Sequence, residues 1–142
     1  MKIKDIMTKN VASLNSNDTV ERAAQLMREH DVGAIPVCSE EKIIGVITDR
    51  DIALRTVASG ENAAQQTVRN AMTSTPVVAK PDMDVREAAR IMKERQIRRL
   101  PVIENGNLVG MVSLGDFAVE ERTDDCAEEA LCGISEPCSP KL

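Results

Sequence analysis

The sequence of 142 residues contains no tryptophan or tyrosine and a single phenylalanine. Because the bases of single-stranded nucleic acids stack on aromatic side chains, this lack removes the usual platform for binding single strands. Positive charge is not in excess either, since 18 lysines and arginines stand against 23 aspartates and glutamates. A dedicated nucleic-acid binder carries a basic footprint. We therefore do not expect nucleic acid to be the main partner.

Long hydrophobic runs are absent as well. No apolar stretch approaches the roughly 20 residues that a membrane-spanning helix needs. The first residues, MKIKDIMTKN, contain no apolar core of the signal-peptide type. We expect a cytoplasmic protein with no membrane partner. The composition, 42% hydrophobic and 29% charged, is typical of one globular domain or of two small halves that share a core.

Motifs of catalysis and of phosphate-binding loops are missing. His30 is the single histidine, and it ends a helical pattern without an obvious acid or nucleophile partner, which favours a capping or surface role. The sequence has no GxGxxG loop, no Walker-type loop and no HExxH motif. We expect no enzymatic activity, no metal site and no required cofactor.

Three of the four cysteines and the negative charge gather near the C-terminus. Cys126, Cys132 and Cys138 follow one another with five residues between neighbours, and Cys38 stands alone. This spacing matches neither a CxxC pair nor a zinc pattern, so we expect reduced thiols, with a metal or redox site in the tail as the alternative. Residues 120–142 hold seven acids and two bases, so the formal net charge of −5 resides in this tail.

One sequence unit is present twice. Residues 5–54 align without a gap on residues 70–119 at an offset of 65, with 12 identical pairs in 50 positions. The identical pairs are Met7/Met72, Thr8/Thr73, Val20/Val85, Ala23/Ala88, Ala24/Ala89, Met27/Met92, Glu29/Glu94, Pro36/Pro101, Val37/Val102, Gly45/Gly110, Asp51/Asp116 and Ala53/Ala118. Because each copy is too small to bury its own sheet, we expect the two copies to fold together.

Each copy predicts the order strand, helix, strand, strand, helix. The first helix has apolar residues at i, i+3, i+4 and i+7, after N-cap candidates at 17–19 and 82–84. These stripes are Val20, Ala23, Ala24 and Met27 in one copy and Val85, Ala88, Ala89 and Met92 in the other. Hairpin strands are expected at 34–38 and 43–48 and at 100–103 and 108–113, closing helices at 51–59 and 116–121, and a helical tail from Arg122 to Glu129. Only the second hairpin has the strong turn signal Asn105-Gly106.

The predicted fold is a mixed α/β fold of the α+β kind, with two repeats packed about a pseudo-twofold axis. We assign residues 1–60 to the first repeat, 61–67 to a connector, 68–121 to the second repeat and 122–142 to an acidic, cysteine-containing tail. This arrangement resembles the cystathionine-beta-synthase (CBS) domain pair, or Bateman module, over about residues 3–119. The resemblance rests on the helix stripes and on IMT with AMT, IPV with LPV, and GVITDRD with GMVSLGD, each pair separated by 65 residues.

The resemblance implies a regulatory, ligand-sensing module. Members of this family have two clefts between their repeats, bind adenosine compounds such as AMP, ADP, ATP, S-adenosylmethionine or NAD, and associate as disc-like homodimers. They usually regulate an attached enzyme, channel or transporter. The repeats occupy most of this chain, so we expect an unknown effector protein to receive the signal, with an adenine nucleotide as regulatory ligand.

The two strand-to-helix junctions, Thr48-x-x-Asp51 and Ser113-x-x-Asp116, allow two interpretations. Each resembles a helix capping box, in which the hydroxyl and carboxylate only accept backbone N–H groups. Alternatively, the hydroxyl can hydrogen-bond a ligand phosphate near the helix start, and the carboxylate can accept two adjacent ribose hydroxyls. The resemblance maps the family's ribose-binding acid onto Asp51 and Asp116, and its Ser/Thr onto Thr48 and Ser113.

The resemblance also pairs the start of one repeat with the acid of the other. Without aromatic residues, the adenine slot must be aliphatic. The cleft that we expect to favour phosphorylated ligands comprises Thr8, Val11, Ala12, Arg98, Arg99, Leu100, Pro101, Ser113 and Asp116. The second cleft comprises Thr73, Val77, Ala34, Ile35, Pro36, Thr48, Arg50 and Asp51. The alternative for each aliphatic position is ordinary core.

The two predicted clefts differ in charge. Arg98 and Arg99 precede the proline of the second repeat, where the first repeat has Gly33 and Ala34. By analogy with the family these arginines contact ligand phosphates, whereas the other cleft has only Arg50 for this purpose. The alternative is solvated surface arginines. For the whole chain, the rival hypothesis is a protein-interaction scaffold with vestigial clefts.

Overall fold

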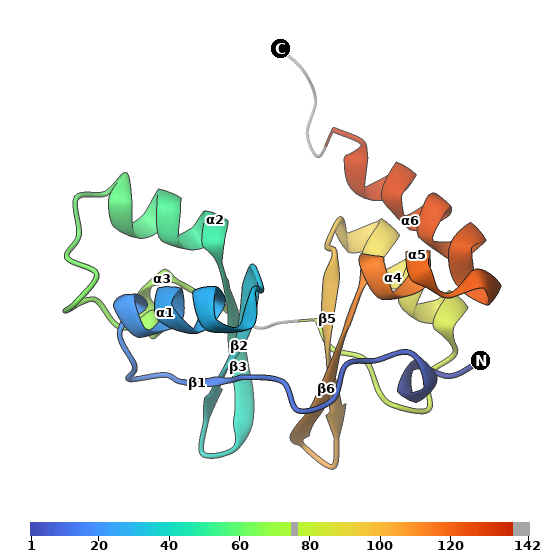
Figure 1. Cartoon of the computed structure of the whole chain (residues 1–142), viewed down its shortest axis with the longest axis horizontal. Coiled ribbons are helices and arrows are strands. Elements are labelled where there is room, and N and C mark those ends of the chain that lie inside the picture. Colours follow the sequence, from blue (N-terminus) through green and yellow to red (C-terminus); the bar gives the residue numbers. More distant parts are fainter. Residues whose placement is uncertain (75–76, 138–142) are drawn as a thin grey trace. The chain divides into compact units, whose positions relative to one another are not determined.

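The computed structural model of the chain describes residues 1–74 and 77–137 (Figure 1). Its elements follow the predicted order in the first repeat, and in the second an isolated bridge at Ala79 takes the place of the first strand. The first repeat contains β1 (Leu14–Asn15), α1 (Val20–His30), β2 (Ala34–Ser39), β3 (Lys42–Thr48) and α2 (Asp49–Ile52), which continues as the π-helix η2 (Ala53–Val57). The second repeat contains α4 (Val85–Arg95), β5 (Arg99–Glu104), β6 (Asn107–Ser113) and α5 (Leu114–Val119). The remaining elements are η1 (Ile3–Asp5), α3 (Val68–Ala71), β4 (Thr73–Ser74), η3 (Glu121–Thr123) and α6 (Asp124–Ser135). The prediction of a mixed α/β fold built from tandem repeats is confirmed.

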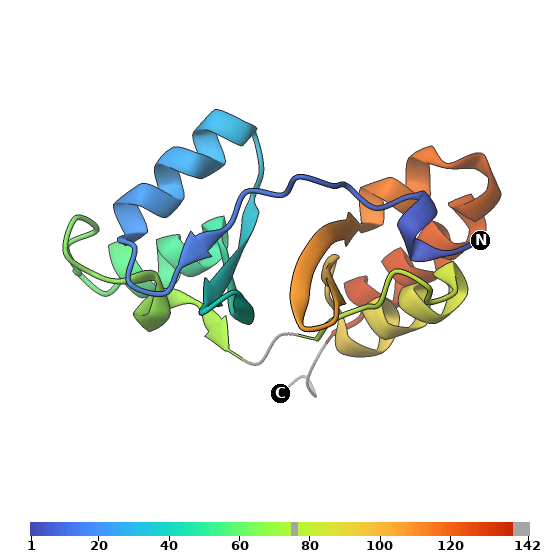
Figure 2. The same ribbon diagram turned by 90° about the horizontal axis from the view of Figure 1, so that it is seen from below.

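The chain divides into two compact units, each of which contains parts of both repeats. Unit 1 comprises Met1–Asn10, Val77–Asn105 and the chain from Val109 onward, and unit 2 comprises Val11–Pro76 and Gly106–Leu108. Each unit therefore joins the sheet of one repeat to the start of the other. Figure 2 shows this exchange for unit 1, where the N-terminal segment lies beside the helices of the second repeat.

The sheet of unit 2 has the order β1-β2-β3-β4. Its β1 is parallel to β2, and its β4, the start of the second repeat, is antiparallel to β3. Unit 1 repeats this pattern around β5 and β6, but single bridges replace the two edge strands: Thr8–Met111 is antiparallel and Ala79–Val102 is parallel. These bridges lie 65 residues from Thr73–Val46 and Leu14–Val37, so the register obeys the sequence repeat.

The stripes of α1 and α4 face the cores of their own units, with one exception. The predicted N-caps are correct, since Thr19 accepts the Arg22 N–H and Asp84 accepts the Arg86 N–H. Ala24, however, is exposed, whereas its equivalent Ala89 is only 5% exposed. The prediction that Ala24 belongs to the buried stripe was wrong, and Leu26 is buried on α1 instead.

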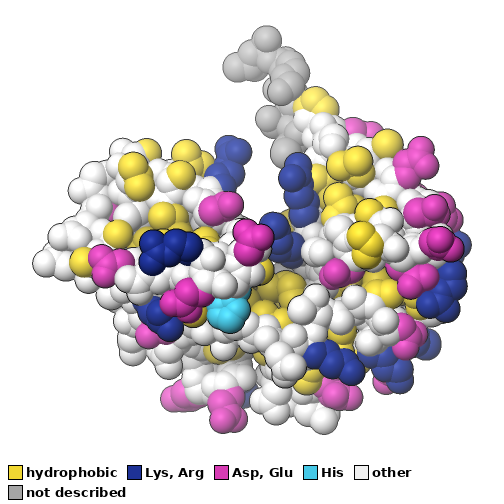
Figure 3. Space-filling view, in the orientation of Figure 1, with side chains coloured by type: hydrophobic (Ala, Val, Ile, Leu, Met, Phe, Trp, Pro, Cys, Tyr) yellow, Lys and Arg dark blue, Asp and Glu magenta, His cyan; other side chains and the backbone are white. Residues whose placement is uncertain are grey.

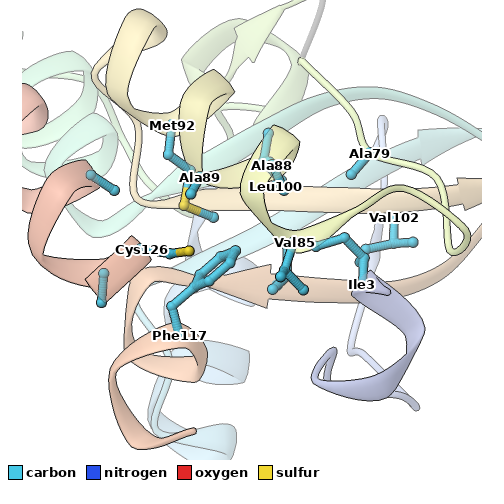
Figure 4. Packing of buried hydrophobic residues seen from close by; sticks show 13 residues of the cluster. Ile3, Ala79, Val85, Ala88, Ala89, Met92, Leu100, Val102, Phe117 and Cys126 are labelled. Atoms are coloured by element: carbon cyan, nitrogen blue, oxygen red, sulfur yellow. The ribbon is translucent and has the colours of Figure 1, made fainter. Parts of the chain in front are cut away.

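The difference between these two alanines follows from α6, which packs against α4 and α5. We expected helix only to Glu129, but α6 continues to Ser135. It adds Cys126, Ala127 and Ala130 to the core of unit 1, where Figure 4 shows Cys126 beside the ring of Phe117. Its acidic face is turned outward, as the acidic side chains over α6 in Figure 3 show.

Both hairpins close with a two-residue turn in the left-handed region. Asn105 and Gly106 have φ of 53° and 82°, which matches the type I′ turn that Asn-Gly predicts. Glu40 and Glu41 have φ of 52° and 68° at the equivalent place. The first hairpin thus adopts the same turn with residues poorly suited to it.

The closing helices begin two residues earlier than predicted, because the cap residues are Thr48 and Ser113. Among the described residues, none of the helices combines the length and apolar character needed to cross a membrane.

Candidate functional site

The two strand-to-helix junctions form complete capping boxes. In unit 1 the Ser113 hydroxyl accepts the Asp116 N–H at 3.2 Å, and Asp116 Oδ2 accepts the Ser113 N–H at 2.8 Å. In unit 2 the Thr48 hydroxyl accepts the Asp51 N–H at 3.0 Å, and Asp51 Oδ2 accepts the Thr48 N–H at 2.9 Å. Each carboxylate is thereby fixed at the start of its helix and remains half-buried.

These boxes use only one oxygen of each carboxylate. Among the described residues, no hydrogen-bond donor contacts Oδ1 of Asp51 or of Asp116. A carboxylate oxygen accepts up to two hydrogen bonds, so each junction presents an oriented acceptor that the cap does not use. Capping and ligand binding are therefore compatible at these residues, although the sequence presented them as alternatives.

The start of each repeat lies beside the junction of the other. Thr8 exchanges both backbone hydrogen bonds with Met111, two residues before Ser113, at 2.8 and 2.9 Å. Thr73 is paired in the same way with Val46, two residues before Thr48. The expected pairing of Met7 onward with the Asp116 side, and of Met72 onward with the Asp51 side, is thus met at Thr8 and Thr73, whose side chains are exposed.

Two glycines make this close approach possible. A Cβ on Gly110 would lie 2.7 Å from Met7 Sδ and 2.9 Å from the Thr8 carbonyl oxygen. A Cβ on Gly45 would lie 2.5 Å from Met72 Sδ and 2.6 Å from the Thr73 carbonyl oxygen. The glycine that opens each of the motifs GVITDRD and GMVSLGD is therefore the point where the other repeat crosses the strand.

Arg98, two residues before the buried Leu100, and Gly33, two residues before the buried Ile35, also border the junctions. The Arg98 carbonyl accepts the Leu114 N–H at 2.8 Å, and the Gly33 carbonyl accepts the Asp49 N–H at 2.9 Å. The backbone of Arg98 is therefore held directly beside the start of α5. No ion pair within the described ranges engages Arg98, Arg99 or Arg50, and all three side chains are exposed. Their charge is available to an anion.

Several predicted slot residues belong to the core. Ile35 and Leu100 are 0% exposed and pack within the clusters of their own units. Ala34 is 7% exposed. Pro36 and Pro101 are buried as well. Burial of the side chains at these five positions agrees with the alternative of ordinary packing, and their role beside adenine stays a prediction.

The other slot residues are half-buried but lie in the opposite unit. Val11 and Ala12 belong to unit 2 while Asp116 belongs to unit 1, and Val77 belongs to unit 1 while Asp51 belongs to unit 2. Their role beside adenine stays a prediction.

The cysteines do not form a cluster in the described part of the chain. Cys126 is 3% exposed in the core of unit 1, and its burial, with the neighbouring Asp125 carboxylate as a smaller cause, raises the pKa of its thiol. Cys132 is exposed on α6, and Cys138 lies outside the described residues. No group of three or more metal-ligating side chains occurs in residues 1–74 and 77–137.

Sequence reasoning missed a set of polar contacts in unit 2. Arg55, in η2, donates from Nη1 to the carbonyl oxygens of Met72 at 2.7 Å and Ala71 at 3.2 Å. The buried Thr56 hydroxyl contacts Gln66 Oε1 at 2.6 Å. The only signal for these contacts was the failure of the repeat here, since Glu120 and Glu121 stand 65 residues after Arg55 and Thr56.

Comparisons with known proteins agree on one family. The sequence model of the CBS domain matches residues 3–56 and again residues 68–120. CBS domain-containing protein YhcV of Bacillus subtilis (strain 168) is 45% identical over 133 residues, covering 94% of each chain. Hypoxic response protein 1 of Mycobacterium tuberculosis (strain ATCC 25618 / H37Rv) is 35% identical over 116 residues, covering 81% of each chain.

Solved structures with this fold hold different ligands. Hypoxic Response Protein I with two coordinated zinc ions has a TM-score of 0.77 at 35% identity, covering 83% of this chain and 97% of that chain. CBSX2 in complex with AMP has a TM-score of 0.70 at 28% identity, covering 81% and 91%. The CBS domain pair of protein MJ0100 with 5′-methylthioadenosine and S-adenosyl-L-methionine has a TM-score of 0.75 at 28% identity, covering 83% and 93%.

Proposed function

This chain belongs to the CBS-domain family, and from that premise we propose that it is a regulatory module that senses an adenosine-type ligand. The ligand class comprises AMP, ADP and ATP, with NAD and S-adenosylmethionine as further members. In this proposal the chain performs no chemistry. It associates as a homodimer and passes the ligand state to an effector protein. A ligand can shift such a module only if it binds two conformations with different affinity.

The observation that carries the proposal is the half-used carboxylate of each capping box. Asp116 Oδ2 is held by the Ser113 N–H, and Oδ1 has no donor within the described residues, so the free acceptor is oriented before any ligand arrives. A carboxylate oxygen is a strong acceptor for ribose hydroxyls, because a hydrogen bond to an ionised acceptor is roughly twice as strong as a neutral one. AMP, 5′-methylthioadenosine and S-adenosylmethionine, which similar proteins hold, share the adenosine group.

We name two candidate sites. The Asp116 site comprises Thr8, Arg98, Ser113 and Asp116, and the Asp51 site comprises Gly33, Thr48, Asp51 and Thr73 with Arg50 nearby. Each site combines the start of one repeat with the junction of the other. The Arg98 backbone adjoins the start of α5, and Gly33 stands in its place in the other repeat. We therefore assign phosphorylated ligands to the Asp116 site.

Thermal unfolding with a panel of AMP, ADP, ATP, NAD and S-adenosylmethionine tests the proposal. A ligand present at 100 times its Kd stabilises the folded chain by about 2.7 kcal/mol, which corresponds to an increase in Tm of roughly 5 to 10 °C. Asp116→Ala should remove the increase caused by a phosphorylated ligand, and Asp116→Asn, which keeps an oxygen for the Ser113 N–H, should reduce it.

The control variant is Asp84→Ala. Asp84 caps α4 away from the candidate sites. Its loss should lower the Tm without ligand by about as much as Asp116→Ala does, because each variant removes one helix cap and the loss of an N-cap costs about 1 kcal/mol. The ligand-induced increase should persist in this variant. Unchanged unfolding curves with every compound at millimolar concentration would contradict the proposal, and an intact increase in Asp116→Ala would contradict the site.

The rival function, a protein-interaction scaffold, is favoured by one observation. Both hydroxyls and one oxygen of each carboxylate are already satisfied by the caps, so the junctions are complete without a ligand. This scaffold would form a defined complex while showing no response to any of the five compounds. A pull-down with and without residues 120–142 shows whether a protein partner binds the acidic tail or the two repeats.

A further inference from the structure

Arg55 connects two segments of unit 2 that are distant in sequence. Its Nη1 donates to the carbonyl oxygens of Ala71 and Met72, which lie 16 and 17 residues further along. Ala71 ends α3, and the last carbonyls of a helix have no partner within the helix. A guanidinium in this position satisfies two such groups at once, and hydrogen bonds from a charged donor are among the stronger ones.

The helix that carries Arg55 also carries Asp51. The helix starts at the Thr48 cap as α2 and continues without a break into η2, a π-helix of five residues. Thr56 and Gln66 hold this π-helix against the connector, since the Thr56 hydroxyl contacts Gln66 Oε1 at 2.6 Å and Gln66 Nε2 donates to the Arg55 carbonyl at 3.2 Å. These contacts of Gln66 with the Arg55 carbonyl and the Thr56 hydroxyl therefore hold the backbone of Arg55 in place.

The segment that Arg55 holds carries Thr73. Met72 immediately precedes β4, which pairs with Gly45 and Val46 of β3. Met72 also packs over Gly45, where no Cβ would fit. Arg55 thus adds a side-chain contact to a segment that β3 already holds by strand pairing and by packing at Gly45.

The second repeat lacks this connection. Glu120 stands at the position of Arg55, cannot donate, and accepts the Arg122 Nε–H at 2.9 Å. The carbonyls equivalent to those of Ala71 and Met72 belong to Ile6 and Met7. No side chain in the described part of unit 1 donates to either of them.

We propose that Arg55 is a positioning residue that preforms the Asp51 site, by tying the helix that bears Asp51 to the segment that bears Thr73. The Asp116 site has no such tie and is ordered by its ligand. The two sites of one chain therefore differ in rigidity as well as in charge. This inference rests on the proposed function, because the Asp51 site is one of its two binding sites.

The test compares Arg55→Ala in two backgrounds, each of which retains one site. Calorimetric titration with 5′-methylthioadenosine, which carries no phosphate, measures the Asp51 site in Asp116→Ala, and titration with AMP measures the Asp116 site in Asp51→Ala. We expect Arg55→Ala to weaken binding about tenfold in the Asp116→Ala background, which corresponds to about 1.4 kcal/mol. In the Asp51→Ala background the change should be less than about twofold.

Two further variants separate positioning from general loss of charge or stability. Arg55→Lys keeps one donor and should recover part of the affinity, while Arg69→Ala removes an exposed arginine of α3 and should change nothing. Amide hydrogen exchange of Thr73 and Ser74, without ligand, should accelerate in Arg55→Ala and not in Arg69→Ala.

The failures of the two proposals are distinguishable. If the unaltered chain binds neither of these compounds and none of ADP, ATP, NAD and S-adenosylmethionine, the proposed function is overturned. If it binds and Arg55→Ala weakens both sites equally or neither, the positioning role of Arg55 is overturned while the proposed function stands. Absence of binding in the Asp116→Ala background would also overturn the role of Arg55, because no Asp51 site would then exist.

Discussion

Gly110 shows how one residue decides whether two distant segments can meet. A methyl group at this position would lie 2.9 Å from the Thr8 carbonyl oxygen, and a backbone atom cannot rotate away as a flexible side chain does. We predict that Gly110→Ala lowers the free energy of unfolding by about 1 to 3 kcal/mol, as overpacking does elsewhere. Chemical denaturation measures this change.

The matched control is Gly115→Ala, five residues away in α5. Apart from its chain neighbours and the backbone of its own helix, the nearest atom to a Cβ at Gly115 would be Ser113 Oγ at 3.6 Å, an ordinary contact, and alanine favours a helix. This variant should leave stability unchanged or raise it by up to about 1 kcal/mol. A loss in Gly115→Ala as large as that in Gly110→Ala would show that the Thr8 crossing is not the cause.

Residue-level prediction succeeded where a local pattern sets the geometry. The Ser/Thr-x-x-Asp spacing was sufficient to predict both capping boxes, because hydroxyl and carboxylate reach backbone groups only three residues away. It could not decide the side-chain environment of Ile35 and Leu100, since an aliphatic residue in a short strand faces either a core or a slot, and their place beside a ligand stays a prediction. A core-facing and a slot-facing aliphatic residue have the same spacing in the sequence. Only the packed structure shows that the side chains of Ile35 and Leu100 are buried.

At the scale of elements, the two hairpins give a second prediction. Glu40 and Glu41 both adopt φ values above 50°, which a side chain with a Cβ disfavours, while the equivalent Asn105-Gly106 suits this turn. We predict that the double variant Glu40→Asn, Glu41→Gly raises the free energy of unfolding by about 1 kcal/mol. Thermal and chemical unfolding measure the gain.

The reciprocal variant, Asn105→Glu with Gly106→Glu, serves as the control and should destabilise the chain by a comparable amount. If the first double variant is no more stable than the unaltered chain, the first hairpin does not store strain in its turn.

Element boundaries were predictable to within two residues wherever a cap or a turn marks them, and not for α6. The sequence indicated helix only to Glu129, and the residues beyond include Gly133 and Pro137, which disfavour a helix. Tertiary contacts extend it: Gln96 Nε2 donates to the carbonyls of Gly133 and Glu136, and Gly133 lies against the Lys93 side chain. Such contacts from α4 are not visible in a local pattern.

At the scale of the whole chain, the repeat predicted the fold class but not which segments are exchanged. An offset of 65 is equally satisfied if each repeat start pairs with its own sheet or with the other. The resemblance to a known family supplied the exchanged arrangement, and Thr8–Met111 and Thr73–Val46 carry it in the structure. The repeat in the sequence does not by itself distinguish pairing of a repeat start with its own sheet from pairing with the sheet of the other repeat.

The central claim is that the Asp116 site binds an adenosine ligand and that Arg98 contacts the phosphate of this ligand. Calorimetric titration of the purified chain with AMP and with adenosine tests it most directly, with Arg98→Ala as the variant and Arg90→Ala, another exposed arginine of unit 1, as the control.

We predict saturable binding of AMP that Arg98→Ala weakens about tenfold, a loss of about 1.4 kcal/mol, while adenosine binding and the Arg90→Ala variant stay unchanged. No heat of binding with either compound at millimolar concentration would contradict the account, and equal affinities for AMP in Arg98→Ala and the unaltered chain would contradict its reading of phosphate.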